Sequence, residues 1–220
     1  MPAAFGVEVA PAENVSALAY PAAVQRRAGV TLILAHGAGA GQSSGFMTAY
    51  AEALAARGID ILTFNFLYTE CGRRLPDPNK RLESCYRAVI EAVRRRGLLG
   101  PTKLAIASQV AAGGIGDLVG LLFLGYPLRP PGRPDRVRAA HLREVKAPML
   151  FVQGSRDASG TPAGLHPIIQ QIGPSADLYV VEGGDHSFKV LKRVGIPQQE
   201  VHRAIQDRVA AWLRGKAAAT

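Results

Sequence analysis

The sequence predicts an α/β fold: a mainly parallel, doubly wound sheet with helices on both faces. Strand-like and helix-like segments alternate along the chain, as they do where crossover helices join parallel strands. Residues 30–35 form a continuous apolar run with β-branched members, which is typical of a strand buried on both faces. No linker divides the 220 residues, so we expect residues 1–220 to form a single domain.

The chain opens with short strand signals and then a helix. Residues 5–9 and 15–20 are expected to pair as a hairpin that precedes the strand at 30–35. Residues 46–57 are expected to be helical, and Gly58 ends this helix. Its apolar residues on one face are Met47, Tyr50 and Leu54.

The next unit repeats the alternation of strand and helix. Residues 59–66 are expected to form a strand, and the polar stretch 67–80, with two prolines and Gly72, a loop. A helix at 82–96 and a strand at 103–107 follow. The residues that this helix turns inward are Tyr86, Val89, Ile90 and Val93.

The last third holds three more strands and a final helix. Strands are expected at residues 120–125, 148–152 and 178–181, and the four prolines between 127 and 134 predict an extended loop. Residues 197–214 are expected to form the last helix. Its residues at helical spacing are Val201, Ile205, Val209 and Trp212.

Composition and charge limit the function classes. The formal net charge is +9, but the basic residues are spread along the chain without interleaved aromatic residues. This distribution favours a solvated surface over a specific nucleic-acid site. No apolar run approaches the roughly 20 residues of a membrane helix, and the first residues do not resemble a signal peptide. We therefore expect a cytoplasmic protein that does not bind membranes.

Neither a cofactor nor a metal is expected. Cys71 and Cys85 match no metal-ligand spacing, and two free thiols are expected, with a disulfide between them as the alternative. The expected partner is a small ester-like molecule. A homodimer stays among the alternatives for the oligomeric state.

Two loops near the C-terminus carry an acid and a base. Asp157 follows the strand at 148–152, and His186 follows the strand at 178–181 in the stretch Gly183-Gly184-Asp185-His186. An acid after one strand and a histidine after the next is the chain order of the second half of an α/β-hydrolase triad. We expect His186 to act as a general base and Asp157 to orient it.

A small-residue loop follows the strand at 30–35. The stretch His36-Gly37-Ala38-Gly39-Ala40-Gly41 leaves backbone N–H groups free to face a ligand, as an oxyanion loop requires. A dinucleotide loop is the alternative, but the glycine spacing differs and no acidic residue ends the next strand. His36 is expected to fix the loop by hydrogen bonds rather than to react.

The nucleophile is the residue that the sequence does not supply clearly. Gly41-Gln42-Ser43-Ser44-Gly45 matches Gly-x-Ser-x-Gly, but it follows the first long strand instead of the central one, where Ser43 and Ser44 are helix N-cap candidates. Ser108 follows the central strand at 103–107. Its neighbours two positions away, Ile106 and Val110, are β-branched where a nucleophile elbow needs small residues.

These motifs together resemble the dienelactone-hydrolase-like α/β-hydrolases, most closely the branch with the testis-expressed and histone-acetyltransferase-complex-subunit relatives. The motifs that carry the resemblance span residues 36–41, 72–78, 124–132, 153–157 and 184–189.

The resemblance implies the α/β-hydrolase fold, a serine hydrolase, Asp157 and His186 as acid and base, and an oxyanion loop at Gly37, Ala38 and Gly39. The family pattern also has Gly-Gly-Lys-Ser-Met-Gly-Gly after the central strand, where this chain is about nine residues shorter. Family members also tend to have histidine at the position of Arg129.

The sequence is therefore consistent with two functions. The first is serine-hydrolase-type acyl transfer on a small ester, thioester or lactone. The second is a catalytically inactive hydrolase-fold protein that binds a ligand or partner. The missing elbow has three explanations: a segment absent from this sequence, a deletion that abolished catalysis, or Ser108 in a rearranged elbow.

Overall fold

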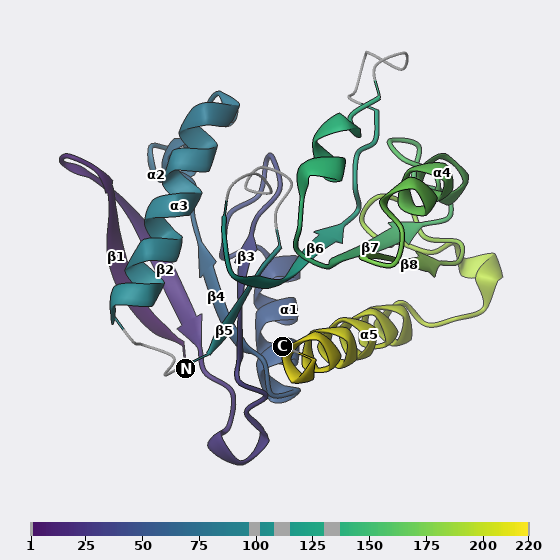
Figure 1. Cartoon of the computed structure of the whole chain (residues 1–220), viewed down its shortest axis with the longest axis horizontal. Coiled ribbons are helices and arrows are strands. Elements are labelled where there is room, and N and C mark those ends of the chain that lie inside the picture. The colour runs from purple at the N-terminus through teal and green to yellow at the C-terminus, as the bar shows by residue number, and fades with distance from the viewer. Residues whose placement is uncertain (1, 97–101, 108–114, 130–136, 220) are drawn as a thin grey trace.

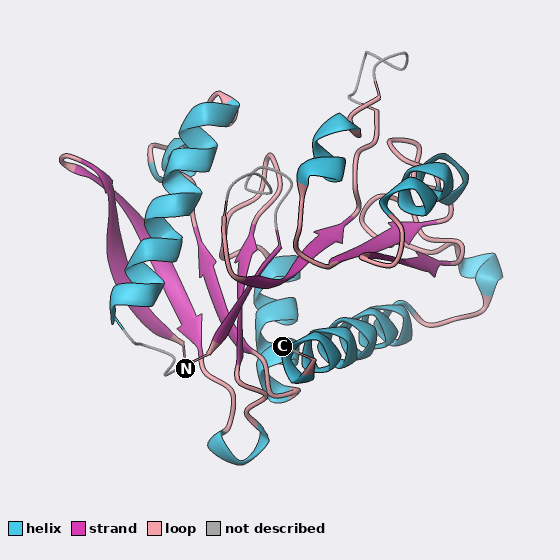
Figure 2. Ribbon diagram, in the orientation of Figure 1, coloured by secondary structure: helices cyan, strands magenta, loops and turns pink. Residues whose placement is uncertain are grey.

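The architecture is a twisted eight-stranded sheet covered by helices (Figures 1 and 2). The computed structural model describes residues 2–96, 102–107, 115–129 and 137–219. In spatial order the strands run β1-β2-β4-β3-β5-β6-β7-β8. Their bounds are β1 Ala3–Ala10, β2 Glu13–Tyr20, β3 Val30–Ala35, β4 Asp60–Phe64, β5 Lys103–Ala107, β6 Leu118–Leu124, β7 Met149–Gly154 and β8 Ala176–Val181.

Strand pairing confirms the mainly parallel α/β sheet. β1 and β2 form the predicted antiparallel hairpin, and β2 pairs antiparallel with β4. All the remaining neighbours, from β4 and β3 through β8, pair parallel. The C-terminal ends of β3 to β8 consequently meet at one edge of the sheet, which is where open α/β sheets bind ligands.

Helices cover both faces of the sheet, with α1 and α5 packed on one face and α3 and α4 on the other (Figure 1). The α-helices are α1 Gly45–Ala56, α2 Leu67–Glu70, α3 Asn79–Arg96, α4 Pro162–Ile172 and α5 Gln198–Ala218. Short 3-10 helices span Val24–Arg26, Ala140–Glu144 and Lys192–Val194.

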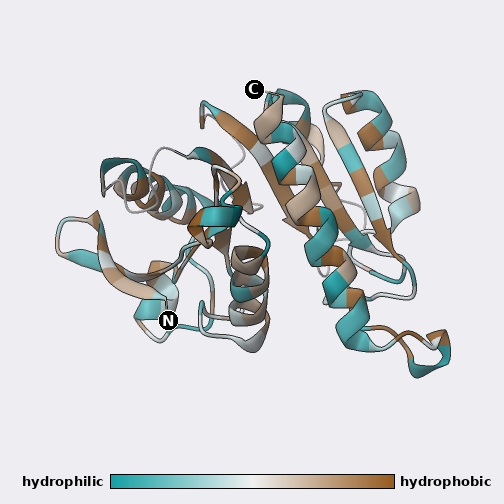
Figure 3. Cartoon of the chain, turned by 90° about the horizontal axis from the view of Figure 1, so that it is seen from below, coloured by the Kyte–Doolittle hydropathy of each residue, from teal (hydrophilic) through white to brown (hydrophobic). Residues whose placement is uncertain are grey.

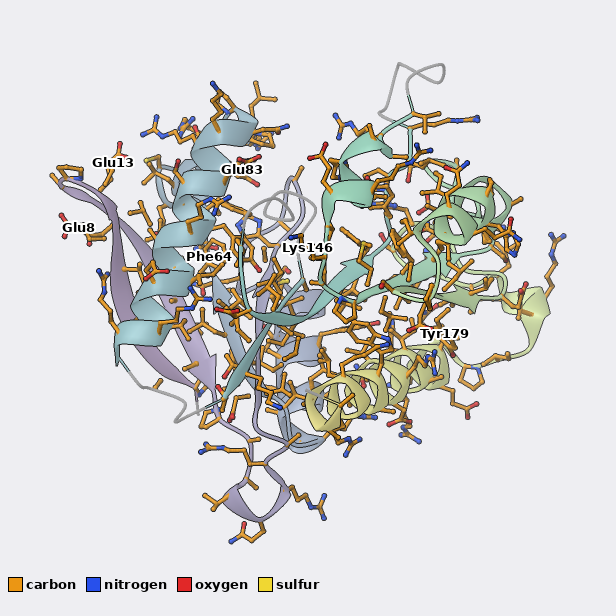
Figure 4. The ribbon with its side chains drawn as sticks, in the orientation of Figure 1. Glu8, Glu13, Phe64, Glu83, Lys146 and Tyr179 are labelled. Carbon is orange, nitrogen blue, oxygen red and sulfur yellow. The ribbon has the colours of Figure 1, made fainter. Side chains whose placement is uncertain are left out.

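Alternation along the strands divides the core into two layers. Ile33 and Phe64 pack on the α3 side, whereas Leu32 packs on the side of α1 and α5, because successive strand side chains point to opposite faces. Figure 4 shows Phe64 between the sheet and α3, and its ring lies 5.2 Å from that of Tyr86. In Figure 3 the strands are mostly hydrophobic, while the helices carry both kinds of residue.

Two sequence-based expectations about elements need correction, and a third is not tested. The stretch 67–80 is not all loop: Leu67–Glu70 is a short helix whose Leu67 and Tyr68 are buried. Helix α3 begins at Asn79, before the expected start. Most of the predicted proline-rich loop lies outside the described residues.

Helix α4 was not expected at all. Pro162, Gly164 and Pro167 lower its intrinsic helix propensity, which hides it from pattern reasoning. The structure compensates with Thr161, whose side chain accepts a hydrogen bond from the Gly164 N–H, and with buried Leu165. Tertiary packing thus overrides local preference here.

Both cysteines are free thiols, as expected, with Cys71 exposed and Cys85 buried. Burial raises the pKa of the Cys85 thiol to about 11. None of the described helices combines the length and apolar character needed to cross a bilayer. Within the same residues no group of three or more His, Cys, Asp or Glu side chains is arranged to hold a metal ion.

Candidate active site

Three loops that the sequence singled out leave the same edge of the sheet. The His36–Gly41 loop follows β3, the Asp157 loop follows β7, and the His186 loop follows β8. Because β7 and β8 are paired neighbours, the acid and the base lie on adjacent loops. The parallel topology thus brings together residues far apart in the sequence.

Asp157 and His186 are in direct contact. His186 Nδ1 lies 2.7 Å from Asp157 Oδ2, which confirms the predicted proximity. The Asp157 side chain is 1% exposed and the His186 side chain 54% exposed. Within the described residues no hydrogen bond occupies His186 Nε2, so this nitrogen is available to a ligand.

Asp157 accepts four hydrogen bonds, which keep it ionised. Oδ2 accepts from His186 Nδ1 and from Gln153 Nε2 at 2.6 Å, and Oδ1 accepts from the N–H and the hydroxyl of Ser159 at 2.8 and 2.6 Å. Burial by itself raises the pKa of Asp157, but the bonds from His186 and Ser159 outweigh it and lower the pKa. An ionised carboxylate accepts only, so Nδ1 carries the proton and Nε2 of neutral His186 has the lone pair.

The hydrogen bond from His186 to Asp157 acts on the histidine as well. It raises the pKa of His186, and burial opposes this only in part. The nearby charges of Asp157 and Asp185 raise it further. Imidazolium is therefore stabilised, which is what a general base needs when it takes up a proton.

Gln153 holds the acid in place, a role that sequence reasoning missed. It is fully buried, and its Nε2 donates to Asp157 Oδ2 and to the Gly160 carbonyl, both at 2.6 Å. Its Oε1 accepts from the Tyr126 N–H at 2.8 Å. A polar residue at the end of an otherwise apolar strand was the available signal.

Ser159 supports the acid and does not occupy the nucleophile position. Its hydroxyl lies 3.1 Å from His186 Nδ1, the nitrogen that faces Asp157. Its proton goes to Asp157 Oδ1, so it acts as a donor to the carboxylate. A nucleophile would have to face Nε2 instead.

The loop after β3 is held at its start by His36. The Phe66 N–H donates to His36 Nε2 at 3.2 Å, so the proton of this buried, neutral ring is on Nδ1, which donates to the Gly37 carbonyl at 3.0 Å. Burial lowers the pKa of His36, in agreement with the neutral form. This confirms that His36 has a structural role.

The hydrogen bond from His36 to the Gly37 carbonyl also affects the predicted oxyanion loop. In a trans peptide the Ala38 N–H points opposite to the Gly37 carbonyl, so fixing one fixes the other. No hydrogen bond among the described residues occupies the N–H groups of Ala38 and Gly39.

The end of this loop is held by a polar cluster. Asn65 Oδ1 accepts from the Gln42 N–H at 2.8 Å, and Gln42 Nε2 donates to Ser16 Oγ at 2.6 Å. The Ser16 hydroxyl in turn donates to Glu70. Both ends of the loop are therefore attached to residues 65–70, which is the preorganisation that oxyanion donors need.

The structure places the three serines considered as nucleophiles in different positions relative to the described residues. Ser44 is the N-cap of α1 by position, but its hydroxyl makes no capping bond and is buried without a partner in the described structure. Ser43, exposed beside it, lies in the connection from β3 to α1. Ser108 lies outside the described residues.

His202 corrects a further expectation. The sequence shows no companions for His141, His166 or His202 and predicts that all three are surface groups, whereas the structure places His202 half-buried between Tyr50 and Gln198. His141 is exposed as expected, with Nε2 3.4 Å from the Tyr126 hydroxyl.

Comparison with solved structures agrees with this fold. A dienelactone hydrolase from Anabaena variabilis superposes with a TM-score of 0.75 at 18% identity, covering 96% of each chain. An α/β serine hydrolase without a lid from Xanthomonas campestris gives a TM-score of 0.71 at 20% identity, covering 96% of this chain and 94% of that one. A serine hydrolase homologue from Coxiella burnetii gives 0.72 at 20% identity, covering 94% and 96%. At these identities the likeness concerns the fold.

The family assignment rests on the sequence match. Residues 28–214 match the α/β hydrolase domain family and include all three loops of the candidate site. The match covers most of the chain, and the chain therefore belongs to the α/β hydrolase family.

Proposed function

We propose that this protein hydrolyses a small carboxylic ester, thioester or lactone by acyl transfer through a serine. The observation that carries the proposal is the buried, ionised Asp157 bound to Nδ1 of a half-exposed His186 whose Nε2 is free in the described structure. The lidless serine hydrolase and the dienelactone hydrolase with the same fold support the substrate class.

Each part of the site has a role in this reaction. His186 Nε2 takes the proton of the serine hydroxyl as it attacks the acyl carbon, and then gives it to the leaving alkoxide or thiolate. Asp157 orients the ring and stabilises the imidazolium. The N–H groups of Gly37, Ala38 and Gly39 are the candidate donors to the tetrahedral oxyanion, and water then releases the acid.

The nucleophile in this proposal comes from the connection after β5. β5 ends at Ala107 and β6 begins at Leu118, and the first residue of the connection is Ser108. In the α/β-hydrolase pattern the nucleophile elbow follows the central strand, which makes Ser108 the residue to test first.

We extend the proposal to the family branch, the domain organisation and the location of the protein. The ordered motifs support membership of the dienelactone-hydrolase-like group, in the branch with testis-expressed and histone-acetyltransferase-complex-subunit relatives. We also propose a single domain, a cytoplasmic location and no specific nucleic-acid partner.

A non-catalytic binding protein is the second candidate, and one observation favours it. The β5–β6 connection, residues 108–117, is shorter than the dozen or more residues usual for a parallel crossover, and it lacks Gly-x-Ser-x-Gly. A chain that has lost its elbow keeps the acid and base loops but has no serine aligned with Nε2.

Labelling with a fluorophosphonate probe separates the two candidates. The enzyme should form a covalent adduct on one serine, located by peptide mass spectrometry, and His186→Ala should abolish labelling. The matched control is His166→Ala, which changes an exposed histidine on α4. A folded protein that is neither labelled nor able to hydrolyse p-nitrophenyl acetate, thioacetate or lactone substrates contradicts the proposed enzyme function.

A further inference from the structure

The turn that presents His186 contains a conformation that needs external support. Phe188, two residues after His186, has φ +62° although it carries a bulky side chain that is 1% exposed. Such a left-handed conformation persists only where surrounding contacts hold it. Part of the support is internal: Asp185 Oδ1 accepts from the N–H groups of Ser187 and Lys189, both at 2.9 Å.

The external support comes from Gln198, the first residue of α5. Gln198 Nε2 donates to the Phe188 carbonyl at 2.8 Å, and Gln198 Oε1 accepts from the Val190 N–H at 3.0 Å. A backbone carbonyl only accepts and an N–H only donates, so these two bonds fix the orientation of the amide. One side chain thus holds the strained residue and the end of the turn.

His202, one helical turn later, holds Gln198 in turn. Its Nε2 lies 3.1 Å from Gln198 Nε2, and since the amide nitrogen only donates, His202 Nε2 accepts. The ring is therefore neutral with its proton on Nδ1, 3.0 Å from the Tyr50 hydroxyl. Burial lowers the pKa of His202, which agrees with a neutral ring.

The chain of contacts ends in the hydrophobic core. Tyr50 is 1% exposed on α1, and the Phe46 ring stacks on it at 4.1 Å. Helix α1 is thereby connected through α5 to the turn that carries His186.

We propose that Gln198 is a positioning residue for His186, and that His202 and Tyr50 fix the orientation of its amide. The inference rests on the proposed function in that it assumes His186 to be the base. Without the amide, Phe188 relaxes from its left-handed conformation and the turn carries His186 away from Asp157. The pKa of His186 then falls toward its ordinary value, because the hydrogen bond from Nδ1 to Asp157 and the nearby charges of Asp157 and Asp185 are what raise it.

The informative variant is Gln198→Glu, which keeps the size and packing of the side chain. A carboxylate still accepts from Val190, but it cannot donate to the Phe188 carbonyl, and it draws a proton onto His202. Gln198→Ala removes both bonds. The matched control is Gln199→Ala, which truncates the exposed neighbour on the same helical turn.

The experiment is an NMR titration of the histidine Cε1–H signals in the full chain, with the His186 signal assigned from His186→Ala. In Gln198→Glu we expect the pKa of His186 to fall by at least about half a unit, a threefold change in proton affinity. The pKa of His202 should rise, and Gln199→Ala should titrate like the wild type. Thermal melting confirms that each variant is folded.

Two outcomes are decisive. A folded Gln198→Glu in which His186 titrates as in the wild type overturns the proposal and leaves Gln198 a structural residue only. The titration does not depend on catalysis, so an inactive protein with a shifted His186 refutes the proposed function and leaves the positioning role intact.

Discussion

At the scale of single residues, the hydrogen bond between Asp157 and His186 affects folding and function in opposite ways. The raised pKa of His186 gives a stabilising contribution that is complete below its unfolded pKa and disappears as pH rises through its folded pKa. The lowered pKa of Asp157 gives a contribution that is complete above its unfolded pKa and disappears as pH falls through its folded pKa. The charged pair is therefore most stabilising between the unfolded pKa of Asp157 and the unfolded pKa of His186, and its contribution disappears as pH passes the folded pKa on either side.

Activity should follow the neutral form of His186. We expect kcat/KM to fall as pH drops through a pKa above the ordinary value of 6.5, because imidazolium cannot accept the serine proton. Asp157→Asn should move this limb to lower pH and reduce kcat on the order of 10⁴-fold, since the amide favours the wrong tautomer. Rate measurements from pH 5 to 9 test this, and an unmoved acidic limb in Asp157→Asn would exclude Asp157 as the orienting acid.

Gln153 offers a test of stability at the same scale. Replacing it by leucine leaves the buried Tyr126 N–H and Gly160 carbonyl without a hydrogen-bond partner. Each unsatisfied group should lower the free energy of unfolding by about 1–3 kcal/mol. Urea unfolding should show this loss in Gln153→Leu. Gln170→Leu, on the exposed side of α4, should change stability by less than about 0.5 kcal/mol. Equal stabilities of the two variants would show that the buried amide makes no net contribution.

At the scale of elements, the strand ends bring the loops of the site together closely enough to require glycine. Gly125 follows β6 with φ +73°, and a Cβ there would lie 2.8 Å from the His186 carbonyl oxygen and 3.2 Å from ring atoms Cε1 and Nδ1. Gly154 ends β7, and a Cβ there would lie 2.4 Å from the carbonyl oxygens of Gly184 and Asp185. The close approach of β6 and β7 to the turn after β8 therefore determines where His186 lies.

Gly125→Ala should consequently separate activity from stability. The methyl group displaces His186, and a displacement of about 1 Å costs on the order of 10²-fold in kcat/KM. Gly173→Ala is the matched control, because its φ is +82° but nothing lies within 4 Å of the added Cβ. In both variants the free energy of unfolding should fall by about 1–2 kcal/mol, because alanine is strained at a positive φ. If Gly173→Ala loses as much activity as Gly125→Ala, contact with His186 is not the cause.

At the scale of the whole molecule, several basic side chains lie in ion pairs on different elements. Ion pairs join Arg81 to Glu13, Arg57 to Asp207 and Arg94 to Glu91. Figure 4 shows Glu13 on the β1–β2 hairpin and Glu83 on α3, so acidic groups stand among the arginines of this helix. These observations support the prediction that the net charge of +9 is not gathered into one phosphate-binding surface.

Binding to duplex DNA should therefore be weak and salt-dependent. We expect fluorescence anisotropy to show an affinity in the non-specific range of about 10⁻⁴–10⁻⁶ M at physiological salt, or weaker, because few phosphates are neutralised together. Sub-micromolar affinity that survives 0.15 M salt would overturn this expectation. A Lys/Arg-rich peptide of equal charge serves as the control for counterion release.

The sequence alone determined the fold class, most of the strands and the pairing of Asp157 with His186. These predictions follow from local rules. Apolar runs predict buried strands, and an acid and a histidine that follow successive strands are expected to meet at the same edge of a parallel sheet. Helix α4 escaped detection because its prolines and Gly164 oppose helix formation, and only packing of Leu165 together with the Thr161 cap reveals it.

Only the tertiary structure decided which side chains support the site. The polar Gln153 at the end of an apolar strand was a local signal, but neither its partners nor the roles of Gln198 and His202 could be predicted from the sequence. An amide or imidazole acquires its role from partners brought to it by β7, β8 and α1. The same holds for Gly125, whose need for glycine comes from a loop more than fifty positions away in the chain. Periodicity reports which face of an element is buried, whereas hydrogen-bond partners depend on long-range contacts that no local pattern encodes.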